Sequence, residues 1–278
     1  MHENGASRTA IRVAARRAAH QILDRPPVFE DPLALAVAGA EAAAKAASEA
    51  SPPSLRAFMA ARSRFAEDEL ARAVACGVCQ YVVLGAGLDT FAYRNPHAAL
   101  GLQVFEVDHP ATQQWKRGRL RSAGIEIPAE TVFVAVDFER QPLGDALLSA
   151  GFRAGEPAFF SWLGVVPYLT EGAFLATMSF IAGLPPASGV VCDYAVPRHA
   201  LSPREQVALD ALASRVAAAG EPFRLFFDPA QLSAQVRRLG FRHLEDLDAA
   251  EINSRYFRGR ADGLSIRGRA GHLLSARV

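Results

Sequence analysis

The chain has 278 residues, of which half are hydrophobic and 21% are charged, and its formal net charge at pH 7 is +1. This composition predicts a folded core rather than a disordered chain, and the near-neutral balance gives no general attraction to nucleic acid or to an anionic membrane. No apolar run reaches the roughly 18 residues that a spanning helix needs, and residues 1–20 lack the apolar core of a signal peptide, so we expect a cytoplasmic protein.

Residues 1–75 are rich in alanine and arginine and are interrupted by prolines, which predicts a series of helices. The alanine-rich stretch 41–50 fits a loosely packed helix, and 54–75 fits a better one with a partial apolar face. We expect this part to form a helical cap on a second domain, residues 76–278. Cys76 and Cys79 form a C-x-x-C, but the sequence has no second pair, so we predict no metal site.

From residue 80 onward, short apolar runs alternate with helical patterns. Strand-like runs lie at 81–84, 102–107, 131–138, 158–163, 190–194, 241–247 and 272–278, and helical patterns include 110–123, 171–182 and 203–219. This alternation predicts an α/β fold with a seven-stranded, mostly parallel sheet and helices on both of its faces. Residues 195–230 separate the fifth and sixth strands, and we expect this insertion to add to the cap.

The most specific motif is YVVLGAGLDTFAYR, residues 81–94, in which the first strand runs into Gly85 and Gly87. We expect a helix to follow this turn, so that its backbone N–H groups approach a polar or anionic ligand. A dinucleotide site would need a third glycine where Thr90 stands. A ligand with a ribose but no pyrophosphate, such as S-adenosylmethionine (SAM), therefore fits better than the alternative, a nicotinamide cofactor.

Acidic residues follow the next two strands. Glu106 and Asp108 end the second strand. Asp108 lies 21 residues after Gly87, a position at which a carboxylate can accept hydrogen bonds from ribose hydroxyls. Strand alternation points both side chains the same way, so the sequence does not choose between them. For Asp108 the alternative is a helix cap before Pro110. Asp137-Phe138 ends the third strand and suits an adenine, or else a polar strand end beside a core ring.

YVVLGAGLDTFAYR, VFEVDHPATQQWK, FVAVDFE and FFSWLGVVPYLT together resemble the leucine carboxyl methyltransferase family, most closely its bacterial branch of polyketide-type O-methyltransferases. The resemblance, which covers roughly residues 54–278, implies a class I SAM-dependent methyltransferase with a Rossmann-like sheet and a helical cap. It assigns Arg62 to the methionine carboxylate, Gly85 in its glycine turn to the methionine part of SAM, Asp108 to the ribose, and Asp137-Phe138 to the adenine. We expect methyl transfer to a carboxyl or hydroxyl oxygen of a small molecule, polyketide-like or a carboxylic acid.

The chain departs from this family at Leu163, in SWLGVVPYL, where many members have a glutamate. This change removes a polar contact to the cofactor. It leaves open a second hypothesis, a SAM-binding regulator that has lost catalysis.

The sequence offers several candidates for a general base near the ends of strands, namely His109, Tyr168, Asp193 and Tyr194, and no pattern selects one of them. Phe223, Phe226 and Phe227 in the insertion fit an apolar acceptor pocket, or else they anchor the cap to the core.

Overall fold

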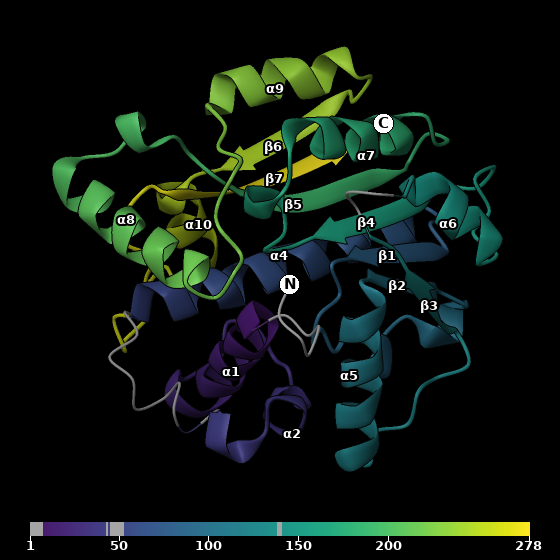
Figure 1. The fold of residues 1–278 in the computed structure, drawn as a ribbon, viewed down its shortest axis with the longest axis horizontal. Coiled ribbons are helices and arrows are strands. Elements are labelled where there is room, and N and C mark those ends of the chain that lie inside the picture. Colours follow the sequence, from purple (N-terminus) through teal and green to yellow (C-terminus); the bar gives the residue numbers. More distant parts are fainter. Residues whose placement is uncertain (1–7, 43, 45–52, 138–140) are drawn as a thin grey trace.

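The computed structural model describes residues 8–42, 44, 53–137 and 141–278. At its centre is a seven-stranded sheet of order β3-β2-β1-β4-β5-β7-β6 (Figure 1). The strands are β1 Gln80–Leu84, β2 Gln103–Asp108, β3 Thr131–Ala135, β4 Ala158–Trp162, β5 Gly189–Ala195, β6 His243–Leu247 and β7 Gly271–Arg277. The first five strands pair in parallel, whereas β7 runs antiparallel to both of its neighbours, β5 and β6. The predicted α/β sheet is therefore confirmed.

Helices cover both faces of this sheet, because the strands are apolar on both sides (Figure 1). Tyr81 and Val83 of β1 face a layer that contains α4 (Pro53–Ala75) and α10 (Ala249–Tyr256). Val82 and Leu84 face α6 (Leu143–Ser149), α7 (Glu171–Ala182) and α9 (Pro229–Arg238). The helix predicted at 54–75 thus packs on the sheet itself.

The first two helices lie beside α4 and against the loop at the carboxyl end of β1. Alanines of α1 (Arg8–Leu23) and α2 (Ala34–Ala38) pack with Leu88 and with Leu120 of α5 (Pro110–Ser122). Arg17 of α1 donates a hydrogen bond to the carbonyl of Leu88 at 2.6 Å. This contact holds α1 against the loop that follows β1. The boundary at residue 75 between a cap and a second domain stays a prediction.

One predicted helix is absent. Between β1 and β2, a fully described stretch, the chain forms only the 3₁₀ turns Phe91–Tyr93 and Ala98–Leu100. Asp89 accepts a hydrogen bond from the N–H of Phe91 at 2.8 Å, and Asn95 accepts one from the N–H of His97 at 2.9 Å. Pro96 also disfavours a helical Asn95. The prediction of a helix after the glycine turn was wrong because local side chains bind this backbone into turns.

The segment between β5 and β6 contains α8 (Pro203–Ala217) and an extended stretch that returns to the sheet. The N–H of Phe227 donates to the carbonyl of Ala195 at 3.0 Å, and the N–H of Arg224 donates to the carbonyl of Pro167 at 2.7 Å. These bonds tie the insertion to the 3₁₀ turn Val166–Tyr168, which follows β4, and to the end of β5. Within the described part of the chain, no helix is long and apolar enough to cross a membrane.

Candidate functional site

The glycine turn lies at the carboxyl end of β1, with Gly85 at φ +65° and Gly87 at φ +46°. These left-handed angles favour glycine at both positions. The N–H groups of Gly85 and Ala86 donate to the carbonyl of Val107 at 2.8 and 3.0 Å, and that of Gly87 donates to Asp108 Oδ2 at 2.6 Å. The N–H groups of the turn therefore donate to β2, and the expectation that they reach a ligand was wrong.

Asp108 stands directly beside this turn, at the end of β2. Besides Gly87, the N–H of His109 donates to its Oδ1 at 2.7 Å, and each carboxylate oxygen keeps a further lone pair for a ligand. Burial raises the pKa of Asp108 and outweighs these two hydrogen bonds. The alternative that Asp108 caps a helix is wrong, because the capping residue of α5 is His109, whose Nδ1 accepts from the N–H of Ala111 at 3.3 Å.

Glu106 points to the same side of β2, as alternation predicted, but it lies deeper. Its carboxylate is 1% exposed, lies 2.8 Å from Lys116 Nζ and accepts from the hydroxyl of Tyr93 at 2.9 Å. Burial raises the pKa of Glu106 despite the nearby lysine. This buried pair leaves Asp108 as the acid that faces the strand ends.

Arg62 comes from the middle of α4 and is buried. Its Nη1 donates to Asp193 Oδ2 at 2.8 Å, and the N–H of Gly164 donates to the other oxygen of the same carboxylate. Gly164 follows β4, and a Cβ at this position would lie 2.9 Å from the guanidinium of Arg62. Asp193 thus joins α4 to the ends of β4 and β5, a role that its position near a strand end did not reveal.

Strand β3 ends at Ala135, earlier than the predicted end at 138, so Asp137 lies two residues beyond the strand. The N–H of Val136 still donates to the carbonyl of Asp108 at 3.0 Å, so Asp137 stays near the end of β2. Phe138 and most of the predicted helix at 41–50 lie outside the described residues.

Side chains from other elements cover the glycine turn. A Cβ on Gly85 would lie 2.3 Å from Val165 Cγ2, and one on Gly87 would lie 3.2 Å from the Cβ of Ala10 in α1. Val165 belongs to the segment that also carries Leu163, whose half-buried side chain packs on the α4 side of the sheet. The site is therefore walled by α1 and by the loop after β4.

Two of the remaining candidates for a base are engaged elsewhere or hold their proton. Tyr194 donates to Asp246 at 2.6 Å, and burial raises its pKa far above the ordinary value. Burial also raises the pKa of Tyr168 to about 12, with Glu221, Arg62 and Asp193 as charged neighbours. At neutral pH both tyrosines are protonated.

The three phenylalanines of the insertion, residues 223, 226 and 227, lie in two different surroundings. Phe227 is buried, with its ring centroid 4.8 Å from that of Phe174, so it belongs to the core. Phe223 lies 5.3 Å from the ring of Tyr168 and 6.2 Å from that of Phe226. Phe223 therefore lies beside the tyrosine that neighbours Arg62 and Asp193.

These side chains fit SAM in their chemistry. Two carboxylates, Asp108 and Asp137, follow neighbouring strands, as a ribose and an adenine amine require. The guanidinium of Arg62 suits the carboxylate of the amino-acid tail. The glycine turn lies between the two, although Val165 must move for a ligand to touch Gly85.

A family model described as leucine carboxyl methyltransferase matches residues 10–182 of the chain. A Bacillus subtilis protein named "Putative S-adenosyl-L-methionine-dependent methyltransferase YktD" is 39% identical over 74% of this chain and 67% of its own length. A similarly named protein of Mycobacteroides abscessus is 41% identical over 59% of this chain and 56% of its own. The chain thus spans about two thirds of the first relative and little more than half of the second.

Two crystal structures share the fold. One, named a "putative methyltransferase" of Thermobifida fusca YX, has a TM-score of 0.60 at 18% identity and covers 95% of this chain and 93% of its own. The other is a DUF574 family protein of Streptomyces avermitilis, with a TM-score of 0.55 at 19% identity over 95% of this chain and 96% of its own. At these identities the likeness shows the architecture alone.

Proposed function

The chain belongs to the leucine carboxyl methyltransferase family of SAM-dependent methyltransferases, and we propose that it transfers the methyl group of SAM to a carboxyl or hydroxyl oxygen of a small molecule. The observation that carries this proposal is the 2.6 Å hydrogen bond from Gly87 to Asp108, which places a half-buried carboxylate against the glycine turn. The acceptor, its oxygen atom and the cytoplasmic location remain predictions.

In this proposal each polar side chain of the site has one task. Asp108 accepts from the ribose hydroxyls, Asp137 from the adenine amine, and Arg62 binds the carboxylate of the amino-acid tail. SAM supplies a methyl group that is already activated by its sulfonium. The protein then contributes alignment of the two reactants and a dry site, and alignment alone is worth about 7–11 kcal/mol of a barrier.

The groups around the site bear on whether the acceptor is a carboxylate or a hydroxyl. A carboxylate is an anion at neutral pH and needs no base, whereas a hydroxyl needs one within hydrogen-bond reach. Tyr168, with its pKa raised to about 12, does not accept a proton at neutral pH, and Asp193 is committed to Arg62. Glu221 is the remaining carboxylate beside Tyr168, and its Oε2 is buried without a hydrogen-bond partner among the described residues.

The first test is calorimetric titration of the protein with SAM, S-adenosylhomocysteine and NAD. Binding of the two sulfur ligands without binding of NAD is the expected result. If neither sulfur ligand bound, the result would favour a site that has lost its affinity for SAM, with Leu163 in place of the family's glutamate.

The second test separates the two acceptor classes. Turnover with carboxylic acids and with phenols is compared between the wild type and Glu221→Gln. For a carboxylate acceptor we expect Glu221→Gln to leave turnover nearly unchanged. A loss of about 10²-fold or more with a phenol would assign the base to Glu221 and the acceptor to the hydroxyl class.

A further inference from the structure

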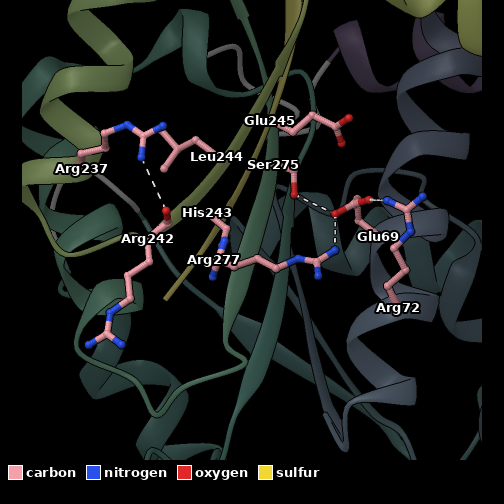
Figure 2. Close-up of a pocket in the computed structure, with 9 residues that line it drawn as sticks. All are labelled: Glu69, Arg72, Arg237, Arg242, His243, Leu244, Glu245, Ser275 and Arg277. Atoms are coloured by element: carbon pink, nitrogen blue, oxygen red, sulfur yellow. Dashed lines mark hydrogen bonds and ion pairs between the residues drawn. The ribbon is translucent and has the colours of Figure 1, made fainter.

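A cavity of about 440 Å³ lies at the opposite edge of the sheet from the methyltransferase site (Figure 2). Arg277, which lines it, pairs with Gly189 at the start of β5 and with His243 at the start of β6, whereas Asp193 lies toward the other end of β5. The volume lies in the range of about 300–1,000 Å³ that is typical of small-molecule sites. The lining residues are Glu69, Arg72, Arg237, Arg242, His243, Leu244, Glu245, Ser275 and Arg277.

One wall of this cavity is already neutralised. Figure 2 shows Arg72 and Arg277 pointing toward Glu69, which forms ion pairs with both. The side chain of Glu69 is 3% exposed and also accepts from the hydroxyl of Ser275 at 2.9 Å. Glu245, the second acid of the lining, pairs with Arg255 of α10. The two carboxylates are thus occupied.

The other wall carries positive charge without compensation. Across the described ranges, the structure gives neither Arg237, in the last turn of α9, nor Arg242 a carboxylate partner. Arg237 Nη1 donates to the carbonyl of Arg242 at 3.5 Å, and the backbone N–H of Arg242 donates to the carbonyl of Arg277 at 2.8 Å. Both side chains are exposed, and Figure 2 shows their guanidinium groups extending in different directions from this backbone contact.

From this arrangement we propose that the cavity is a second binding site, for a small anion with several phosphate or carboxylate groups. Guanidinium groups bind both kinds of oxyanion with paired hydrogen bonds. Arg237 and Arg242 are its primary contacts, and Arg277, whose side chain is 29% exposed, borders them. Because the cavity lies at the far strand ends, its ligand is neither SAM nor the methyl acceptor.

The test is calorimetric titration of the full chain with pyrophosphate and, separately, with citrate, at constant ionic strength. We expect saturable binding of one molecule of at least one anion, and the preferred anion tells phosphate from carboxylate recognition. The double variant R237Q/R242Q should weaken binding by about tenfold or more, the effect of losing about 1.4 kcal/mol.

The matched control is Arg238→Gln, one residue further along α9, at an exposed arginine outside the lining. It should change the affinity by less than about twofold, since surface charge at a distance is screened. Thermal melting of all variants checks that the fold persists. Absence of saturable binding of both anions to the wild type, or an equal loss in Arg238→Gln and in the double variant, would overturn the proposal.

Discussion

Arg62 of α4 and Asp193 of β5 form a buried ion pair, with 2.8 Å between Nη1 and Oδ2. They are 131 positions apart in the sequence. The pair lies where the ends of β4 and β5 meet α4, since the same carboxylate accepts from Gly164. It therefore sets the position of the one cation that we assign to the cofactor.

Replacing Asp193 with asparagine tests whether this pair holds the site. The change leaves the buried guanidinium of Arg62 without its counter-charge, and breaking buried pairs in this way costs about 3–5 kcal/mol. We expect the free energy of unfolding in urea to fall by this order. The exposed pair of Arg198 and Asp210 offers a control, because Asp210→Asn should change little. Equal stability of the two variants would contradict a structural role for Asp193.

Asp108→Asn should weaken SAM binding by more than about tenfold while the fold persists, because an amide replaces one acceptor oxygen beside Gly87 with a donor. Asp145→Asn, at an exposed position in α6, is the control and should bind SAM as the wild type does. Titration of both variants gives the comparison. Unchanged affinity in Asp108→Asn would remove Asp108 from the cofactor site.

The same carboxylate predicts how SAM binding depends on pH. The ionised form accepts the ribose hydroxyls, and burial raises the pKa of Asp108 above its ordinary value of 3.8. Affinity should therefore fall as the pH drops through this raised pKa, earlier than for an ordinary aspartate. Titrations from pH 7 down to about pH 4 test this in the wild type and in Asp108→Asn. An equally steep fall in the variant would assign the pH dependence to another group.

Gly85→Ala should destabilise the protein through two separate effects. The new methyl would lie 2.3 Å from Val165 Cγ2, and the φ of +65° costs a residue with a side chain about 1–2 kcal/mol. Adding Val165→Ala should recover the free energy of unfolding that the steric contact costs, but not the part that the φ of Gly85 costs, as measured by urea unfolding. Gly118→Ala, in open space on α5, is the control and should be neutral or stabilising. No recovery in the double variant would mean that Val165 does not press on the turn.

Lys116→Met should cost about 3–5 kcal/mol of stability at neutral pH, because it leaves Glu106 buried without its counter-charge. Burial already raises the pKa of Glu106 above its unfolded value, and removing the lysine raises it further. An acid with a raised folded pKa favours the folded state when protonated, so the loss should shrink as the pH falls through that pKa. Urea unfolding at neutral and acidic pH checks this sign. A loss that is independent of pH would point to packing rather than charge.

Phe227→Ala and Phe226→Ala distinguish core anchoring from acceptor binding. Phe227 packs on Phe174 in the core, so its truncation should cost about 3–5 kcal/mol. Phe226 is only partly buried and should cost less. Stability and SAM affinity are measured for both. If Phe226→Ala lost both as severely as Phe227→Ala, Phe226 would belong to the core rather than to the acceptor site.

Much of the fold was predictable, because parallel strands buried on both faces are short apolar runs that end in glycines or acids. Residues 171–182 form a helix as predicted, and the apolar runs became the seven strands with shifts of up to three residues at their ends. The helix expected after the glycine turn failed for a local reason, since Asp89 and Asn95 compete for the backbone and Pro96 restricts it.

By itself the sequence determined the sheet, its glycine turn and the acid at the end of β2, because periodicity and turn residues are local properties. Only the tertiary structure decided what those groups do. It bound the turn N–H groups to β2, paired Glu106 with Lys116, joined Arg62 to Asp193, and set Arg277 against Glu69, 208 positions away. Contacts at such separations depend on how strands and helices pack, and no local pattern along the chain reports them.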